Sequence, residues 1–227
     1  MSRTRIKICG ITRPEDAALA AELGADAIGL NFVRGPRQLD LERGREIVQS
    51  LFTPPMRPNI VALCGWRGPE APNCLTTGEV ANNLRVDRFQ IYGQSELRLA
   101  DGEDGVPYWM VASISGRKSI TDLAIFLGIE KLRPLAILLD TASSTQLGGT
   151  GQSFNWNWIA EARAAGELAK LPPIILAGGL TPENVAEAIR IAQPYAVDVS
   201  SGVEAAGKPG VKDSIKMRDF IQAVQGS

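Results

Sequence analysis

The strongest constraint on the fold of this chain is a regular alternation of short apolar runs with amphipathic stretches. Eight runs of strand length recur about 27 residues apart in the 227-residue sequence. The predicted strands are 6–9, 27–32, 59–63, 88–91, 108–114, 136–139, 174–177 and 196–199. Strands alternating with helices indicate an α/β fold, and eight units match the (β/α)₈ TIM barrel of roughly 250 residues. We therefore predict a single-domain (β/α)₈ barrel over residues 1–227. A doubly wound open sheet is the alternative, because spacing alone cannot close a barrel.

The intervals between the runs carry helical patterns. The expected helices are 14–23, 41–51, 121–130, 156–170, 182–193 and 212–224. Thr12 and Glu15 have capping-box spacing around Pro14, Asp40 precedes the second helix as a cap, and Thr181 is the expected N-cap before Pro182. Two intervals are weaker: 69–83 predicts a short or broken helix, and the turn-rich run 101–105 leaves room only for a brief one.

Composition excludes several functions. The formal net charge of −1 gives no basic surface for nucleic acid or anionic membranes, and no apolar run approaches the roughly 20 residues of a membrane helix. The chain contains no histidine, which excludes Ser-His-Asp and Cys-His pairs and any histidine-ligated metal. Three cysteines without CxxC spacing argue against a disulfide framework or zinc site, and no signal-peptide pattern opens the sequence. We expect a cytoplasmic protein without a metal.

In a barrel, the active site lies at the C-terminal ends of the strands. That rule selects the following residues: Cys9, Asn31, Cys64, Tyr92, Ile114, Asp140, Gly178, Gly179, Ser200, Ser201 and Gly202. Because side chains alternate along a strand, Cys9 shares its face with Lys7, and Ser200 with Asp198. The first and last strands are neighbours in a closed barrel, so we predict a buried Lys7–Asp198 ion pair beneath the site. The alternative is that Lys7 extends to solvent at the other end of the barrel.

Two consecutive loops have the composition of a phosphate site. Gly178-Gly179 follows the seventh strand, and Ser200-Ser201-Gly202 follows the eighth. Small residues let backbone N–H groups approach a phosphate, and a short helix after Gly202 would direct its N-terminus at it. Residues 148–151 are glycine-rich but lack the Lys-Ser/Thr ending of a P-loop, which favours a lid over the site.

Asp140 and Cys9 are the candidate acid and base. Asp140 ends an apolar run, which favours its protonated form, while Lys7 would favour the thiolate of Cys9. An acid and a base facing each other suit proton transfer on a sugar. The alternatives are ordinary ones: Cys9 is a small core residue, and Asp140 caps the next helix.

These motifs together resemble one enzyme family, the phosphoribosylanthranilate isomerases of tryptophan biosynthesis. The resemblance covers nearly the whole chain, and its motifs fall in the family's order. They are Lys7-Ile8-Cys9-Gly10-Ile11-Thr12, Gly24-Ala25-Asp26-Ala27-Ile28-Gly29, Leu138-Leu139-Asp140-Thr141, Gly149-Thr150-Gly151 with Phe154 and Trp156, Ala177-Gly178-Gly179-Leu180, and Val197-Asp198-Val199-Ser200-Ser201-Gly202-Val203-Glu204.

The resemblance implies a cofactor-free Amadori rearrangement of a phosphosugar amine. It implies that Asp140 protonates the furanose ring oxygen and that Cys9 removes the C2′ proton of the resulting imine. The loops at Gly178-Gly179 and Ser200-Ser201-Gly202 would hold the phosphate, and Arg37 would bind the anthranilate carboxylate. The sequence leaves open whether the chain is a monomer or a homodimer.

The sequence departs from the family's pattern mainly near the middle strands. Tyr92 stands where the family usually has histidine, the third strand ends differently, and a lysine common in the fifth strand is absent. These changes concern the aromatic half of the pocket. Two alternatives therefore stay open at this point: a divergent paralogue acting on another phosphosugar amine, and a non-catalytic phosphosugar-binding protein.

Overall fold

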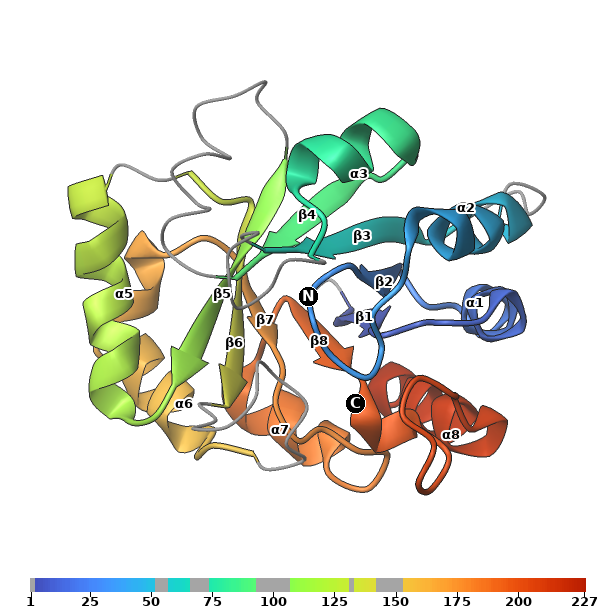
Figure 1. Ribbon diagram of the computed structural model, residues 1–227. Coiled ribbons are helices and arrows are strands. Elements are labelled where there is room, and N and C mark those ends of the chain that lie inside the picture. Colours follow the sequence, from blue (N-terminus) through green and yellow to red (C-terminus); the bar gives the residue numbers. More distant parts are fainter. Residues whose placement is uncertain (1–2, 52–56, 66–73, 93–106, 131–132, 142–152) are drawn as a thin grey trace.

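The computed structural model describes residues 3–51, 57–65, 74–92, 107–130, 133–141 and 153–227. Within these ranges, eight parallel strands close into one barrel in the order β1 to β8 (Figure 1). The strands are β1 (Arg5–Ile8), β2 (Ala27–Asn31), β3 (Asn59–Cys64), β4 (Arg88–Ile91), β5 (Tyr108–Ile114), β6 (Ala136–Thr141), β7 (Ile174–Leu176) and β8 (Ala196–Val199). The predicted barrel is confirmed, and the open-sheet alternative is wrong.

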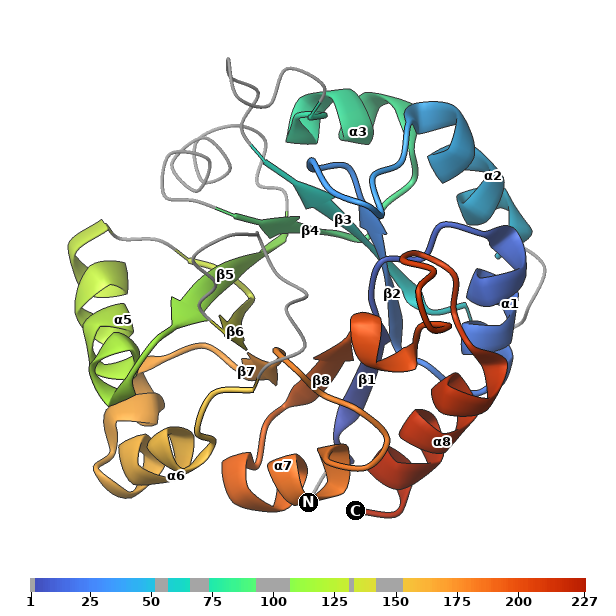
Figure 2. The same cartoon turned by 60° about the horizontal axis from the view of Figure 1, so that its bottom comes forward.

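The helices form a ring outside the barrel (Figure 2). They are α1 (Pro14–Glu22), α2 (Leu41–Ser50), α3 (Thr77–Asn83), α5 (Arg117–Glu130), α6 (Asn157–Ala164), α7 (Val185–Ala192) and α8 (Ser214–Gln225), with 3₁₀ turns η1 (Glu167–Lys170) and η2 (Ser201–Val203). All the predicted helices overlap an observed one, and the predicted cap is present on α2, where Asp40 accepts a hydrogen bond from the Arg43 amide. The run 101–105 and the loop 148–151 lie outside the described residues.

Three helix predictions need correction. Thr12 and Glu15 form no capping box, because the Thr12 hydroxyl instead donates to the carbonyl of Gly210 at 2.6 Å, although Pro14 does occupy the first turn. The stretch 156–170 is broken at Gly166, whose left-handed backbone (φ 75°) separates α6 from η1. Helix α7 begins at Val185 rather than Pro182, because its N-cap is Asn184 and not Thr181.

Strand alternation divides the core into two layers. One apolar cluster lies inside the barrel, and a larger one lies between the strands and the helix ring. The inner cluster consists of Ala27, Val61, Trp109, Ala136, Leu138, Ile175, Ala177 and Ala196. Many of these side chains are small, so they leave space for the polar groups that point inward. Those polar groups therefore lie in an interior that is narrow and largely apolar.

The pairing of β1 with β8, which closes the barrel, determines where the charged residues beneath the functional site lie. Strands β1 and β8 pair in parallel with Lys7 opposite Asp198, so both side chains enter the barrel at the same level.

Among the described residues, no helix is long and apolar enough to cross a membrane. The same residues contain no group of three or more cysteine, aspartate or glutamate side chains placed to hold a metal ion.

Candidate functional site

A pocket opens at the C-terminal ends of the strands, where the sequence predicts the site. Nearly every predicted residue contributes to its wall. The lining residues are Cys9, Gly10, Asn31, Arg37, Leu63, Tyr92, Asp140, Ala177, Gly178, Gly179, Leu180, Asp198, Val199, Ser200, Ser201 and Gly202. The structure thus brings together residues that are up to 193 positions apart, from Cys9 to Gly202.

Two of the strand-end candidates lie elsewhere. Cys64 and Ile114 both belong to the outer apolar cluster between strands and helices. Leu63 lines the pocket in place of Cys64, because neighbouring side chains on a strand point to opposite faces. Burial raises the pKa of the Cys64 thiol far above its usual range, so this cysteine is an inert core residue.

The predicted pair beneath the pocket is present. Nζ of Lys7 donates to Oδ1 of Asp198 at 2.7 Å, and the two side chains are only 2% and 8% exposed. The alternative in which Lys7 reaches solvent is therefore wrong. Burial opposes the charge of Lys7, but Asp198 and the neighbouring Cys9 outweigh it and raise the pKa of Lys7, so the lysine stays protonated.

Cys9 lies directly above this pair, in space that a glycine provides. A Cβ atom added to Gly29 of β2 would lie 2.7 Å from Sγ of Cys9 and 3.1 Å from Nζ of Lys7. Sequence reasoning missed this role, although an isolated glycine inside a strand pattern is the signal for a close approach. Gly29 lets the thiol and the lysine occupy the same small volume.

The charge state of Cys9 differs from the expectation. Lys7 favours the thiolate as predicted, but burial and then Asp198 have larger effects and raise the pKa of the Cys9 thiol. The resting group is therefore a thiol. A base of raised pKa is a stronger proton acceptor once it is ionised, at the cost of a small ionised fraction near neutral pH.

The pKa of Asp140 is shifted in the direction that the sequence predicts. Asp140 ends the inward-facing side of β6, and burial, helped by the charge of Asp198, raises its pKa to about 6. Its Oδ1 accepts the amide hydrogen of Thr141 at 2.8 Å. It does not cap α6, the next helix among the described residues, because that helix begins at Asn157. A carboxyl group with this pKa still holds a proton in part of the molecules at neutral pH.

The two small-residue loops pack against each other at the rim. Gly178 and Gly179 have left-handed backbones, with φ of 83° and 65°. A Cβ atom on Gly202 would lie 1.9 Å from the carbonyl oxygen of Leu180, so only glycine allows the loop after β8 to contact the loop after β7. The 3₁₀ turn η2 begins at Ser201, before Gly202 and not after it as expected. The amides of Gly179 and Ser201 donate no hydrogen bond to any residue that the structure describes.

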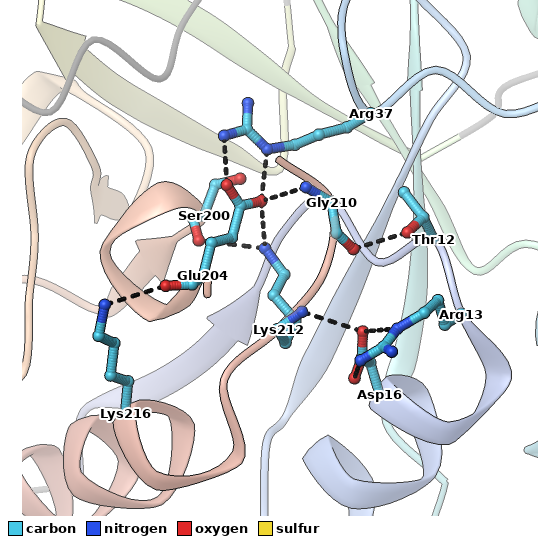
Figure 3. Close-up of polar contacts among 9 residues, drawn as sticks. All are labelled: Thr12, Arg13, Asp16, Arg37, Ser200, Glu204, Gly210, Lys212 and Lys216. Carbon is cyan, nitrogen blue, oxygen red and sulfur yellow. Dashed lines mark hydrogen bonds and ion pairs between the residues drawn. The ribbon is translucent and has the colours of Figure 1, made fainter. Parts of the chain in front are cut away.

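Arg37 crosses the rim beside Cys9 and is held by a carboxylate that sequence reasoning gave no role. Its Nε and Nη2 atoms donate to the two oxygens of Glu204 at 2.6 and 2.7 Å (Figure 3). A Cβ atom on Gly10 would lie 2.4 Å from Cδ of Arg37, so the stem of this arginine packs on the glycine after Cys9. Lys212 joins the same carboxylate at 3.1 Å.

Tyr92, the departure noted in the sequence, also faces the pocket. Its hydroxyl accepts a hydrogen bond from Nε2 of Gln90 at 3.0 Å. Burial, followed by the nearby Cys9 and Asp140, raises the pKa of Tyr92 well above its usual value. The phenol is therefore a permanently protonated group within the electrostatic reach of the candidate acid and base.

Taken together, the fold and the pocket define a (β/α)₈-barrel protein with a strand-end site suited to acid–base chemistry on an anionic ligand. A sequence profile of N-(5′-phosphoribosyl)anthranilate (PRA) isomerase matches residues 76–223. The N-(5′-phosphoribosyl)anthranilate isomerase of Geotalea uraniireducens is 41% identical, over 98% of this chain and 99% of its own length. The corresponding protein of Pseudomonas aeruginosa is 39% identical, over 99% and 97%.

Solved structures agree with these sequence matches. Phosphoribosyl anthranilate isomerase from Thermotoga maritima has a TM-score of 0.80 and 32% identity, covering 99% of this chain and 100% of that one. A phosphoribosyl anthranilate isomerase in complex with reduced 1-(o-carboxyphenylamino)-1-deoxyribulose 5-phosphate has a TM-score of 0.76 and 31% identity, with the same coverage. The chain belongs to the N-(5′-phosphoribosyl)anthranilate isomerase family.

Proposed function

We propose that this chain catalyses the Amadori rearrangement of N-(5′-phosphoribosyl)anthranilate to 1-(o-carboxyphenylamino)-1-deoxyribulose 5-phosphate in tryptophan biosynthesis. The observation that carries the proposal is the shared pocket of Cys9 and Asp140, which the two small-residue loops and Arg37 also line. Such a pocket offers an acid, a base and two anion-binding regions to one substrate. The family membership supplies the identity of that substrate.

Asp140 is the proposed general acid. It donates its proton to the furanose ring oxygen, the bond between that oxygen and C1′ breaks, and the nitrogen lone pair forms the imine. A carboxyl group of pKa about 6 can donate this proton and remain stable as a carboxylate afterwards.

Cys9 is the proposed general base. Its thiolate removes the proton from C2′ of the imine, and the electron pair moves to give an enaminol. The C2′ hydroxyl then loses its proton while C1′ gains one, which produces the aminoketose without net oxidation. Lys7 and Asp198 support this step from below: Lys7 favours the thiolate, and Asp198 keeps Lys7 protonated and in place.

The loops at Gly178-Gly179 and Ser200-Ser201-Gly202 are the proposed phosphate site. The half-buried amides of Gly179 and Ser201 support this, because they donate to no described residue and can donate to a phosphate. Charge supports it as well. Lys7, Arg37 and Lys212 are cations, whereas Asp198 and Glu204 are the anions paired with them, so the site has a net excess of one positive charge while Cys9 and Asp140 are neutral.

Arg37 is the proposed partner of the anthranilate carboxylate. Because Glu204 occupies its Nε–Nη2 side, the substrate carboxylate would use the other side of the guanidinium, which carries Nη1. A guanidinium offers donors on both sides, so the same arginine can be positioned by one carboxylate and bind another.

Several further points belong to the proposal. We infer that residues 1–227 form a single domain, that the protein is cytoplasmic, and that it is a monomer or a homodimer. The closure of one barrel between β1 and β8 supports the first inference, and three buried cysteine thiols suit a reducing compartment. One related structure consists of monomers generated from a dimeric isomerase of Thermotoga maritima. Sedimentation equilibrium decides between monomer and dimer, and a single cooperative unfolding transition is expected.

Growth of a tryptophan auxotroph that lacks this isomerase tests the function. The unaltered chain is expected to restore growth without tryptophan, and Cys9→Ser and Asp140→Asn are expected to fail although they fold. Loss of a general acid or base typically lowers turnover about 10²- to 10⁴-fold. No growth with the unaltered chain, despite tight binding of a phosphosugar, would favour a non-catalytic binding protein. Near-normal growth with either variant would overturn its assigned role.

A further inference from the structure

Glu204 is bonded to residues from separate loops around the pocket rim. Its Oε2 accepts from Nη2 of Arg37, while Oε1 accepts from Nε of Arg37, from Nζ of Lys212 at 3.1 Å and from the amide of Gly210 at 3.0 Å. Its backbone carbonyl accepts from Nζ of Lys216 at 3.0 Å. Glu204 is therefore held at both its main chain and its side chain (Figure 3). Only 7% of it is exposed.

Lys212 carries the connection from Glu204 to the loop after β8. Its Nζ donates to the carbonyl oxygen of Ser200 at 3.1 Å as well as to Glu204, and its side chain is completely buried. Its own amide donates to Oδ2 of Asp16, which Arg13 holds in turn. The first turn of α1 and the loop after β8 are thus joined at the point where Lys212 lies, and the carbonyl of Ser200 has a fixed donor.

The carboxylate of Glu204 also holds the side chain of Arg37. Within the described part of the chain, the side-chain hydrogen bonds of Arg37 all go to Glu204. Its stem rests on Gly10, which has no side chain to restrain the guanidinium. Since an arginine side chain loses much rotational freedom when it is held in one geometry, the carboxylate that holds it makes Arg37 ready for a ligand.

We propose that Glu204 is a positioning residue that fixes both anion-binding ends of the site at once: Arg37 directly, and the Ser200–Gly202 loop through Lys212. The proposal rests on the proposed function, which places the aromatic carboxylate at Arg37 and the phosphate at that loop. Glu204 is not among the residues that line the pocket, so its proposed role acts through Arg37 and Lys212. A carboxylate that only neutralised a buried lysine would have no effect on Arg37.

Calorimetric titration with two separate probes, inorganic phosphate and anthranilate, tests this role. Glu204→Gln removes the charge and one acceptor, so both probes are expected to bind about tenfold more weakly, and KM should rise about tenfold with kcat changed less than about threefold. Arg37→Lys is expected to weaken anthranilate alone. Glu187→Gln, on an exposed ion pair of α7, is the matched control and should leave both affinities unchanged.

A second variant distinguishes a loss of positioning from a loss of stability. Glu204→Gln leaves Lys212 buried without its anion, so Glu204→Gln/Lys212→Met removes both charges together and should recover the melting temperature but neither affinity. Normal binding of either probe by folded Glu204→Gln or Glu204→Gln/Lys212→Met overturns the positioning role. No turnover by the unaltered chain overturns the proposed function instead. Turnover by the unaltered chain, together with weaker binding of both probes by these two Glu204 variants, supports both the proposed function and the positioning role.

Discussion

Two buried lysines flank Cys9, and they differ in what holds them. Lys7 lies in the floor of the pocket, which we define as Lys7, Cys9, Asp140 and Asp198, all carried on or next to strands. Lys212 lies in the rim, which comprises Arg37, Ser200, Glu204 and Lys212, all on loops. Among the described residues, Asp198 forms an ion pair only with Lys7, at 2.7 Å, and Asp198 together with Cys9 raises the pKa of Lys7. Lys212 shares Glu204 with the cation Arg37, and burial lowers its pKa.

The difference between the two lysines follows from the elements that carry them. In the floor, the register of β1 against β8 places one cation opposite one anion, and the pair is as rigid as the barrel. In the rim, one carboxylate serves two cations from loops far apart in sequence. We therefore expect the floor to control stability and proton transfer, and the rim to control ligand affinity.

Removing the two lysines in turn gives the largest expected effects. Lys7→Met leaves Asp198 buried without a cation, so the free energy of unfolding should fall by about 3 to 5 kcal/mol. Lys212→Met leaves Glu204 with Arg37, so the expected loss is about 1 to 3 kcal/mol, from the unsatisfied acceptors. Urea unfolding of both variants measures the contrast. Equal losses would show that the two lysines are held alike, and Asp198→Asn added to Lys7→Met should restore part of the stability.

Replacing Asp140, the proposed acid, should stabilise the fold while it lowers turnover. The pKa of Asp140 is raised from 3.8 to about 6 in the folded chain, so its ionisation penalises folding as the pH rises through that window. Asp140→Asn removes the penalty, and Asn can still accept the Thr141 amide. The variant should gain at most roughly 3 kcal/mol at pH 8 and nothing at pH 3.5. Thermal melts at the two pH values measure this, and a variant less stable at pH 8 would contradict the assigned burial cost.

A methyl group on β2 should disturb the floor without touching the rim. Gly29→Ala puts a Cβ atom where Sγ of Cys9 and Nζ of Lys7 now lie, and overpacking of this kind costs about 1 to 3 kcal/mol. We expect kcat to fall through displacement of the thiol, while the affinity for inorganic phosphate stays unchanged. Gly78→Ala, where an added Cβ atom has nothing within 4 Å, is the control. Normal kcat in Gly29→Ala would show that the close approach has no catalytic importance.

The pH dependence of kcat/KM should reflect the floor alone. In the proposed mechanism the active form has protonated Asp140 and ionised Cys9, although the carboxyl has the lower pKa of the two. For such a reversed pair, kcat/KM rises about tenfold per pH unit below pH 6, because the thiolate fraction of Cys9 grows. Above pH 6 it stays level, because Asp140 loses its proton as fast as Cys9 ionises. It falls above the raised pKa of Cys9, where only the loss of protonated Asp140 continues. Steady-state rates from pH 3.5 upward test it. A plateau already reached near pH 4 would contradict the raised pKa of Asp140.

The floor was predictable from the sequence, whereas in the rim only Arg37 and Ser200 were, and the ion pairs of Glu204 were not. The period of two along strands, together with barrel closure, places Lys7 opposite Asp198 and directs Cys9 and Asp140 into the mouth. Cys64 was misplaced because the strand-end rule ignores this alternation. Glu204 and Lys212 carry no such signal: Lys212 was expected inside a helix, and the bonds of Glu204 depend on loop conformations that no local pattern encodes. The thiol pKa was also wrong in direction, because burial is a property of the packed barrel.

The central claim is that Cys9 removes the C2′ proton, and a substrate deuterated at C2′ tests it most directly. The unaltered chain is predicted to rearrange this substrate with a primary isotope effect and to release the label to solvent. Cys9→Ser, folded and still binding inorganic phosphate, is predicted to release label at least about 10²-fold more slowly. Release of the label by Cys9→Ser at the rate of the unaltered chain would contradict the claim and assign the proton to another group in the pocket.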